Sequence, residues 1–166
     1  MARTEQAIFG AGCFWGTQYY FDQVPGVVKT TVGYTGGHTD NPDWHNTHEE
    51  DTGHTEALLI EFDPTKVSYL TLLKHFFRMH NPTLLNKADE INEGTNYRSA
   101  VFYTSDSQQA QAEAYINELE HNHRYDKPIV TEVAQAQKFW QAEDFHQKFS
   151  ERTGWGICHV PYAPVD

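Results

Sequence analysis

The stretch from Gly10 to Gly16 (GAGCFWG) constrains the fold more than any other part of the chain. Ile8 and Phe9 predict the end of a short apolar strand, the glycines predict a turn, and Cys13 begins a helix that extends to Phe21. This order places the Cys13 sulfur at a helix N-terminus. The helix dipole and unpaired backbone N–H groups favour an anion there, so the pKa of the thiol should fall below its usual value of about 8.5. Cys13 is therefore a candidate nucleophile.

The alternative for Cys13 is that of most free cysteines, a small buried side chain without a chemical role. The glycines at positions 10, 12 and 16 argue against it, because they open the backbone around the sulfur at the strand-to-helix turn. A structural cysteine in a core needs no such clearance.

The length of 166 residues predicts one domain, residues 1–166, with a core over about residues 7–150 and a C-terminal tail at residues 151–166. The N-terminus lacks the apolar run of a signal peptide, and no stretch approaches the roughly 18 apolar residues of a membrane span. We therefore expect a cytoplasmic protein with no membrane partner, acting as a monomer.

The formal net charge is −11, and no cluster of lysine and arginine is present. Binding to nucleic acid depends on neutralising phosphates, so a nucleic-acid partner is not expected. Aromatic residues make up 14% of the chain, and several stand beside glycine-rich or polar segments. Aromatic walls around a small pocket would account for them, as would an ordinary core.

The pattern beyond the first helix predicts an α+β fold. Alternation of apolar residues indicates strands at residues 27–34, 54–62, 99–104 and 129–133, and helical spacing or capping indicates helices at about residues 68–79, 105–120 and 139–150. The order contains the split β-α-β repeat of ferredoxin-like sandwiches. We expect a two-layer α/β sandwich with a mixed, mainly antiparallel sheet and an irregular C-terminal tail.

Glu56 is a candidate acid. By the period of two in a strand, it shares one face with Leu58, Ile60 and Phe62. A carboxyl on an apolar face is poorly solvated, which raises its pKa and makes it a proton donor near neutral pH. The alternative is that Glu56 lies beyond the edge of the sheet, in water.

The two cysteines of the chain, Cys13 and Cys158, stand near its opposite ends. In a reducing cytoplasm a permanent disulfide is not expected, so pairing would take place within a reaction cycle. Glycines at positions 154 and 156 precede Cys158, as expected of a mobile segment that carries a thiol. A thiolate that attacks an electrophile and is released by a second thiol is the pattern of thiol redox catalysis.

Four blocks of the sequence resemble, in order, the signature blocks of the peptide methionine sulfoxide reductases of the A type. They are Gly12–Gly16, Gly33–Gly37, Gly53–Ala57 and Gly94–Ser99. The resemblance extends over nearly the whole chain. It implies a reductase acting on oxidised proteins or free methionine sulfoxide, with thioredoxin as the reductant and no metal or organic cofactor.

The resemblance also implies a role for each site residue. Cys13 would attack the sulfur of an S-configured methionine sulfoxide, and Glu56 would protonate or hydrogen-bond its oxygen. Phe14 and Trp15 would form the apolar pocket for the methyl group, and Tyr97 would hydrogen-bond the oxygen.

Later in the cycle implied by the resemblance, Cys13 would remain as a sulfenic acid. Cys158 would attack it to form an intramolecular disulfide for thioredoxin to reduce. His54, in the third block, is expected among the substrate-binding residues.

Two positions depart from the family pattern. Trp44 stands where the family commonly has a second pocket tyrosine, and an indole N–H can donate a hydrogen bond but cannot accept one. Asn92 stands where a family aspartate precedes the fourth block, which removes a carboxylate near the site. Both are expected to bind substrate, with a reduced rate or a shifted substrate preference.

Three other interpretations use the same residues. A metal site could draw on histidines and acids of one loop and the strand after it: His45, His48, His54, Glu49 and Glu50. A cysteine hydrolase would activate Cys13 with one of these histidines, but it leaves Cys158 unexplained. A binding module with an aromatic pocket would need neither thiol.

Overall fold

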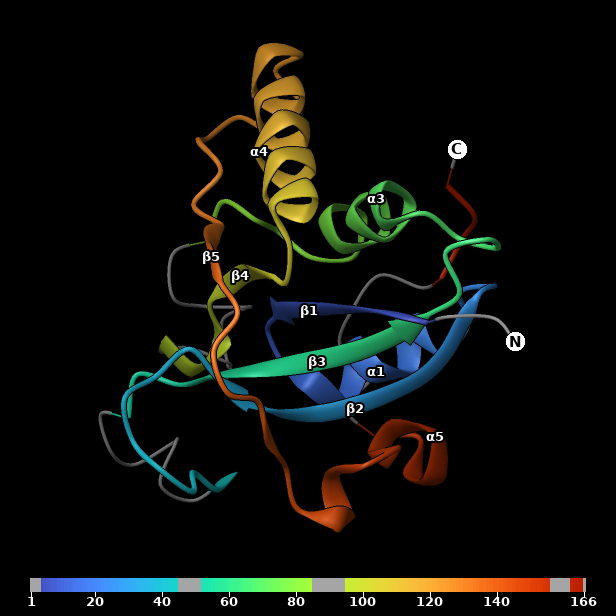
Figure 1. Cartoon of the computed structure of the whole chain (residues 1–166), viewed down its shortest axis with the longest axis vertical. Helices are drawn as coiled ribbons and strands as arrows, with labels where there is room; N and C mark the ends of the chain where they lie inside the picture. Colours follow the sequence, from blue (N-terminus) through green and yellow to red (C-terminus); the bar gives the residue numbers. More distant parts are fainter. Residues whose placement is uncertain (1–3, 45–51, 85–94, 156–161, 166) are drawn as a thin grey trace.

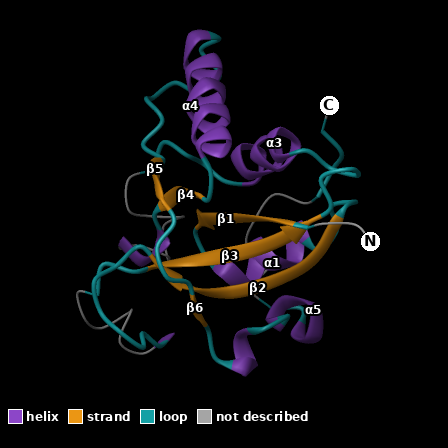
Figure 2. Cartoon of the chain, in the orientation of Figure 1, coloured by secondary structure: helices purple, strands orange, loops and turns teal. Residues whose placement is uncertain are grey.

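The structure, a computed structural model, describes residues 4–44, 52–84, 95–155 and 162–165. In these residues a six-stranded sheet forms the centre of the molecule, with the strand order β5-β4-β1-β3-β2-β6 (Figure 1; β6 is labelled in Figure 2). The strands are β1 (Glu5–Ala11), β2 (Val27–Thr35), β3 (Thr55–Phe62), β4 (Ser99–Tyr103), β5 (Glu132–Gln135) and β6 (Trp140–Gln141).

The sheet is mixed and mainly antiparallel, as the sequence predicted. β1 lies between β3 and β4 and is antiparallel to both, with Phe9 opposite Leu58 in one pair and Val101 in the other. β2 is antiparallel to β3 and β6, and only β5 is parallel to its neighbour, β4, among the described strands. The predicted α+β class is confirmed.

Four α-helices lie among the described residues (Figure 2). They are α1 (Phe14–Phe21), α3 (Tyr69–Met79), α4 (Asp106–His121) and α5 (Phe149–Thr153), with short 3₁₀ turns η1 (Thr95–Tyr97) and η2 (Asp144–His146).

The helices α1 and α3 meet on one face of the sheet. The ring of Phe9 on β1 lies 5.8 Å from that of Phe21 on α1 and 4.8 Å from that of Phe76 on α3, measured between ring centroids. These three side chains are fully buried. The apolar alternation of β1 and β3 therefore buries one face of the sheet against the helices.

The predicted helix starts are confirmed by their caps. Ser68 Oγ accepts a 3.0 Å hydrogen bond from the Thr71 backbone N–H at the start of α3, and Ser105 Oγ accepts a 3.2 Å bond from Gln108 at the start of α4. Each serine satisfies an N–H that has no partner within its helix. Within the described residues no helix is both long and apolar enough to cross a bilayer.

The helix predicted over residues 139–150 is wrong. The chain forms β6, then η2, and turns into the short helix α5 only after Lys148, whose φ of 58° lies in the left-handed region. β6 pairs with Gly33 and Tyr34 on the edge of β2. An edge strand presents unpaired backbone groups, and local sequence periodicity does not reveal that this segment would pair with them.

A close approach of backbones makes this pairing possible. A Cβ at Gly33 would lie 2.4 Å from the Trp140 carbonyl oxygen and 2.5 Å from the ring of Phe139. Only glycine fits at such a distance. Phe139 also packs on the sheet face opposite the helices, against the apolar cluster that includes Ile8 and Phe102.

The last predicted strand is displaced by about three residues. The sequence predicted residues 129–133, whereas β5 spans Glu132–Gln135. An ion pair of 2.8 Å between Arg98 and Glu132 and a 2.8 Å hydrogen bond between the hydroxyls of Ser99 and Thr131 hold this register. Val130 donates its N–H to the Pro82 carbonyl outside the sheet, at 2.8 Å.

Candidate active site

Cys13 stands at the junction of β1 and α1, as the glycine-flanked motif predicted. Gly12 has a φ of 88°, which turns the chain sharply between strand and helix, and Cys13 is the N-cap residue with φ −61° and ψ 119°. Thr17 donates both its N–H and its Oγ1–H to the Cys13 carbonyl, at 3.3 and 3.1 Å. Cys13 is buried, with 8% of its surface exposed.

Glu56 reaches the same place from the sheet. It is the second residue of β3 and only 1% exposed, on the face that also carries Leu58 and Ile60. Its Oε1 accepts a 3.1 Å hydrogen bond from the backbone N–H of Phe14. The alternative that placed Glu56 in water is wrong, and the carboxyl lies beside the residue that follows Cys13.

Aromatic rings surround this junction. Phe14 is 1% exposed, and its ring centroid lies 5.6 Å from that of Tyr34 on β2. Trp15 is half-buried and stacks on Phe149 of α5 with centroids 4.0 Å apart. The first two residues of α1, which directly follow Cys13, therefore carry aromatic rings packed against β2 and α5.

Tyr34 and Glu143 also lie at this site, although neither was predicted as a site residue from the sequence. The hydroxyl of Tyr34, which is fully buried, donates a 3.2 Å hydrogen bond to Glu143 Oε1. Burial raises the pKa of Tyr34 well above its ordinary value, and the negative charges of Glu143 and Glu56 raise it further. Tyr34 is therefore a neutral hydrogen-bond donor over the working range of pH.

Glu143 and His146 connect Trp15 and Trp44. The Trp15 indole N–H donates to His146 Nδ1 at 2.8 Å, and the Trp44 backbone N–H donates to Glu143 Oε2 at 3.2 Å. Trp44 is 39% exposed, and its ring centroid lies 6.3 Å from that of His146. The spacing Glu-x-x-His over one turn could have identified the pair, since residues three apart lie on one side of a turn.

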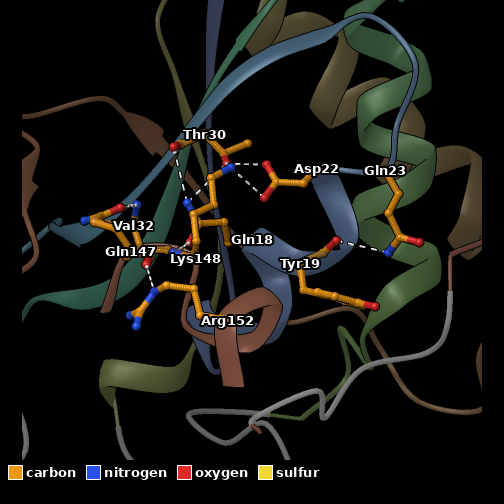
Figure 3. Close-up of polar contacts among 9 residues, drawn as sticks. All are labelled: Gln18, Tyr19, Asp22, Gln23, Thr30, Val32, Gln147, Lys148 and Arg152. Carbon is orange, nitrogen blue, oxygen red and sulfur yellow. Dashed lines mark hydrogen bonds and ion pairs between the residues drawn. The ribbon is translucent and has the colours of Figure 1, made fainter. Parts of the chain in front are cut away.

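A set of polar contacts holds the segment that carries Glu143 and His146 against α1 and β2 (Figure 3). The Gln147 side chain accepts from the Val32 N–H at 3.1 Å and donates to the Val32 carbonyl at 3.0 Å, as a neighbouring strand would. The Lys148 N–H donates to Gln18 Oε1 at 2.7 Å, and Lys148 Nζ pairs with Asp22 at 2.6 Å. These contacts fix His146 beside Trp15.

His54 has a different environment from the substrate contact that was predicted for it. The ring is 3% exposed, Nδ1 accepts from the Gly37 N–H at 3.1 Å, and Nε2 lies 2.7 Å from the Thr39 carbonyl oxygen. Both nitrogens thus bind backbone groups of the segment that leads to Trp44. This geometry favours support of that segment over contact with a substrate.

Tyr97 is the last residue of η1, and a neighbouring contact places this turn near Glu56. The Thr55 hydroxyl donates to the Asn96 carbonyl at 3.0 Å, so the residues next to Glu56 and Tyr97 are joined. Cys158 and Asn92 lie outside the described residues.

The histidine-rich loop proposed as a metal site falls largely on residues that the structure does not describe: His45, His48, Glu49 and Glu50. Among the residues it does describe, no group of three or more potential ligand side chains is placed to hold a metal ion. His54, the described member of that set, uses both ring nitrogens on backbone groups.

Comparison with known proteins agrees with this geometry. Residues 5–166 match the family model described as peptide methionine sulfoxide reductase. A peptide methionine sulfoxide reductase MsrA of Acidobacterium capsulatum is 43% identical over 155 residues, which is 93% of this chain and 99% of that protein.

Solved structures of the same kind of protein share the fold. Methionine sulfoxide reductase A of Corynebacterium diphtheriae is 32% identical, with a TM-score of 0.81 over 93% of this chain and 77% of the other. Mxr1 of Saccharomyces cerevisiae in its reduced form is 26% identical, with a TM-score of 0.87 over 97% of this chain and 93% of the other.

The family match, together with a cysteine at a helix N-terminus beside a buried carboxyl, sets aside the hydrolase and binding-module interpretations. The chain belongs to the peptide methionine sulfoxide reductases of the A type and is a thiol-dependent oxidoreductase that acts on methionine sulfoxide.

Proposed function

We propose that this enzyme reduces the S epimer of methionine sulfoxide, in peptides and as the free amino acid, by a thiol cycle. The Cys13 thiolate attacks the sulfoxide sulfur while Glu56 gives a proton to the oxygen. The bond formed between the two sulfurs then breaks as the hydroxyl moves from the substrate sulfur to the Cys13 sulfur, so methionine leaves and Cys13 becomes a sulfenic acid. The sulfoxide sulfur is reduced by two electrons, and the Cys13 sulfur is oxidised by two.

The hydrogen bond between the Phe14 N–H and Glu56 Oε1, 3.1 Å long, carries this proposal. It fixes a carboxyl that is 1% exposed at the N-terminus of the helix that begins after Cys13. A nucleophile and an acid at one helix end are the two groups that the reduction needs. We propose that the other carboxyl oxygen of Glu56, Oε2, carries the proton that is given to the sulfoxide oxygen.

The aromatic residues around this centre would hold the substrate. We assign the methyl group to the surface formed by Phe14 and Trp15, and the sulfoxide oxygen to Tyr97 together with Glu56. Trp44 and Asn92 would modulate recognition of the oxygen from the positions that hold tyrosine and aspartate in the family. We assign His54 to support the loop that leads to Trp44.

The second half of the cycle would use Cys158. Its thiol attacks the sulfenic sulfur of Cys13, a disulfide forms, and the oxygen leaves as water. Thioredoxin then supplies two electrons and two protons to restore both thiols. Support comes from yeast Mxr1, a structural relative that has also been crystallised in complex with Trx2.

We further propose that one domain over residues 1–166 performs the cycle as a monomer in the cytoplasm, where cysteines are kept reduced. For the fold, we propose a ferredoxin-like unit. The antiparallel order β4-β1-β3-β2, with α1 after β1 and α3 after β3, supports it.

Separate assays with the two epimers of a peptide methionine sulfoxide test the function. With thioredoxin, thioredoxin reductase and NADPH, the wild-type enzyme should turn over the S epimer continuously and leave the R epimer unchanged. Cys158→Ser should release one methionine per enzyme and then stop, whereas Cys13→Ser should release none. Continuous turnover by Cys158→Ser, or equal rates with both epimers, would contradict the proposal.

A further inference from the structure

His146 occupies the centre of the aromatic wall next to Cys13. The ring is 1% exposed, and its centroid lies 5.2 Å from that of Phe14, 5.6 Å from that of Trp15 and 4.0 Å from that of Phe145. His146 therefore contacts both side chains, Phe14 and Trp15, that we propose to line the pocket for the substrate methyl group.

The hydrogen bond from Trp15 fixes the protonation of this ring. An indole N–H can only donate, so His146 Nδ1, at 2.8 Å, must be an unprotonated acceptor. The proton of the neutral imidazole is then on Nε2, which lies 3.9 Å from Glu143 Oε2. Glu143 is thus placed to favour the tautomer that the Trp15 contact requires.

Glu143 connects the same ring to the rest of the wall. Its carboxylate accepts the Tyr34 hydroxyl on one oxygen and the Trp44 backbone N–H on the other, each at 3.2 Å. The imidazole of His146 and the carboxylate of Glu143 therefore accept hydrogen bonds from three aromatic residues, Trp15, Tyr34 and Trp44, which come from three separate parts of the chain. The hydrogen bonds of Gln147 with β2 and of Lys148 with α1 anchor the segment that carries His146 and Glu143.

We propose that His146 is a positioning residue that holds the Trp15 indole in the orientation that lines the methyl pocket. The inference rests on the proposed function, since the pocket is part of it. His146 takes no part in the chemistry of Cys13 and acts through the indole N–H of Trp15. Without an acceptor at Nδ1, that N–H must find another partner, and the Trp15 ring then rotates away from the Phe149 ring on which it stacks.

Two substitutions of His146 separate the hydrogen bond from the shape of the ring. His146→Phe keeps a flat ring of similar size and removes the acceptor. His146→Asn returns an acceptor, because its Oδ1 is attached to Cγ as Nδ1 is in histidine. His121→Phe, at the exposed end of α4, is the matched control.

The kinetic arm uses a peptide with one S-configured methionine sulfoxide. His146→Phe should raise KM about tenfold and change the single-turnover rate at saturating substrate less than threefold. His146→Asn should recover KM to within threefold of wild type, and the control should leave KM unchanged. In a Trp15→Phe background, His146→Phe should raise KM less than twofold, since the donor is already absent.

The spectroscopic arm needs no substrate. In enzyme with ¹⁵N-labelled tryptophan, the indole N–H signal of Trp15 is identified by its loss in Trp15→Phe. The indole proton of Trp15 should exchange slowly with water in the wild type and in His146→Asn, and rapidly in His146→Phe. If His146→Phe changes the exchange rate only of the other three tryptophan indoles and leaves that of Trp15 slow, the proposal is overturned.

Two kinetic results would also overturn it. One is an equal rise in KM in the wild-type and Trp15→Phe backgrounds. The other is a loss of single-turnover rate at unchanged KM, which would make His146 a participant in the reaction. If the wild type releases no methionine from either epimer, the proposed function fails, and the indole exchange still decides whether His146 holds Trp15.

Discussion

The backbone N–H of Phe14 donates a 3.1 Å hydrogen bond to Glu56 Oε1, although the two residues are 42 positions apart. The bond joins the first turn of α1 to the start of β3 and places the Glu56 carboxyl beside the residue that follows Cys13. It also leaves the thiol and the carboxyl in a setting nearly closed to water, since they are 8% and 1% exposed. The proposed thiol cycle depends on this junction.

Glu56→Gln should lower the rate of methionine release in a single turnover by about 100-fold or more, the usual contribution of a general acid. The amide oxygen can still accept from the Phe14 N–H, so the fold should be retained. Glu61→Gln, on the same strand but facing the other side of the sheet, is the control and should act at the wild-type rate. A wild-type rate for Glu56→Gln would remove Glu56 from the mechanism.

Trp44→Tyr should raise kcat/KM for the peptide sulfoxide about three- to tenfold. A tyrosine hydroxyl can donate to the sulfoxide oxygen and at the same time accept a hydrogen bond from a neighbouring donor, whereas the indole N–H only donates, and one added hydrogen bond contributes about 1 kcal/mol. The contact with Glu143 comes from the Trp44 backbone, so it survives the substitution. Steady-state assays with thioredoxin measure the effect, and a fall in kcat/KM would show that the indole itself recognises the substrate.

Stability should fall in acid because of His75. Burial, and then the charge of Arg78, lower the pKa of His75 to about 4 from its ordinary 6.5. Between these values the unfolded chain binds a proton that the folded chain does not, so acidification favours unfolding. In the folded protein His75 Nδ1 lies 2.7 Å from the Tyr20 hydroxyl, and the His75 ring stacks on Tyr162 of the C-terminal tail.

The test compares His75→Gln with the wild type by urea denaturation at pH 7 and pH 4. The free energy of unfolding of the wild type should fall by about 2 kcal/mol more than that of the variant over this range. All other ionisable groups are the same in both proteins, so their contributions cancel in the comparison. An equal fall in both would contradict the assignment.

Gly33→Ala should destabilise the fold by about 2 kcal/mol or more, because the added methyl group would meet the Trp140 carbonyl at 2.4 Å. The backbone of β6 must then move away from β2, which loosens the segment that carries Glu143 and His146. Gly154→Ala is the comparison, since nothing lies within 4 Å of its Cβ and only its φ of 74° opposes the change. Urea denaturation should rank Gly33→Ala as the more damaging of the two.

Local patterns predicted much of the fold. The alternation in β3 placed Glu56 on the buried face with Leu58, and the serine caps located the starts of α3 and α4. The glycine-flanked cysteine motif predicted the strand-turn-helix junction, because its signals lie within a few residues of one another. Each of these inferences depends on neighbours in sequence.

Features set by distant parts of the chain were missed. The segment after Phe139 forms β6 and η2 because the edge of β2 needs a partner, and Gln147 completes that edge with a side chain. Glu143 and His146 acquire their role only when this segment lies against Trp15. The position of β5 depends likewise on an ion pair between Arg98 and Glu132, which no local pattern encodes.

A single turnover of the S epimer without added reductant, followed by peptide mapping under non-reducing conditions, tests the central claim most directly. The account predicts about one methionine per enzyme and one new disulfide, between Cys13 and Cys158. Methionine release with both thiols still free, or no release from the S epimer, would contradict it.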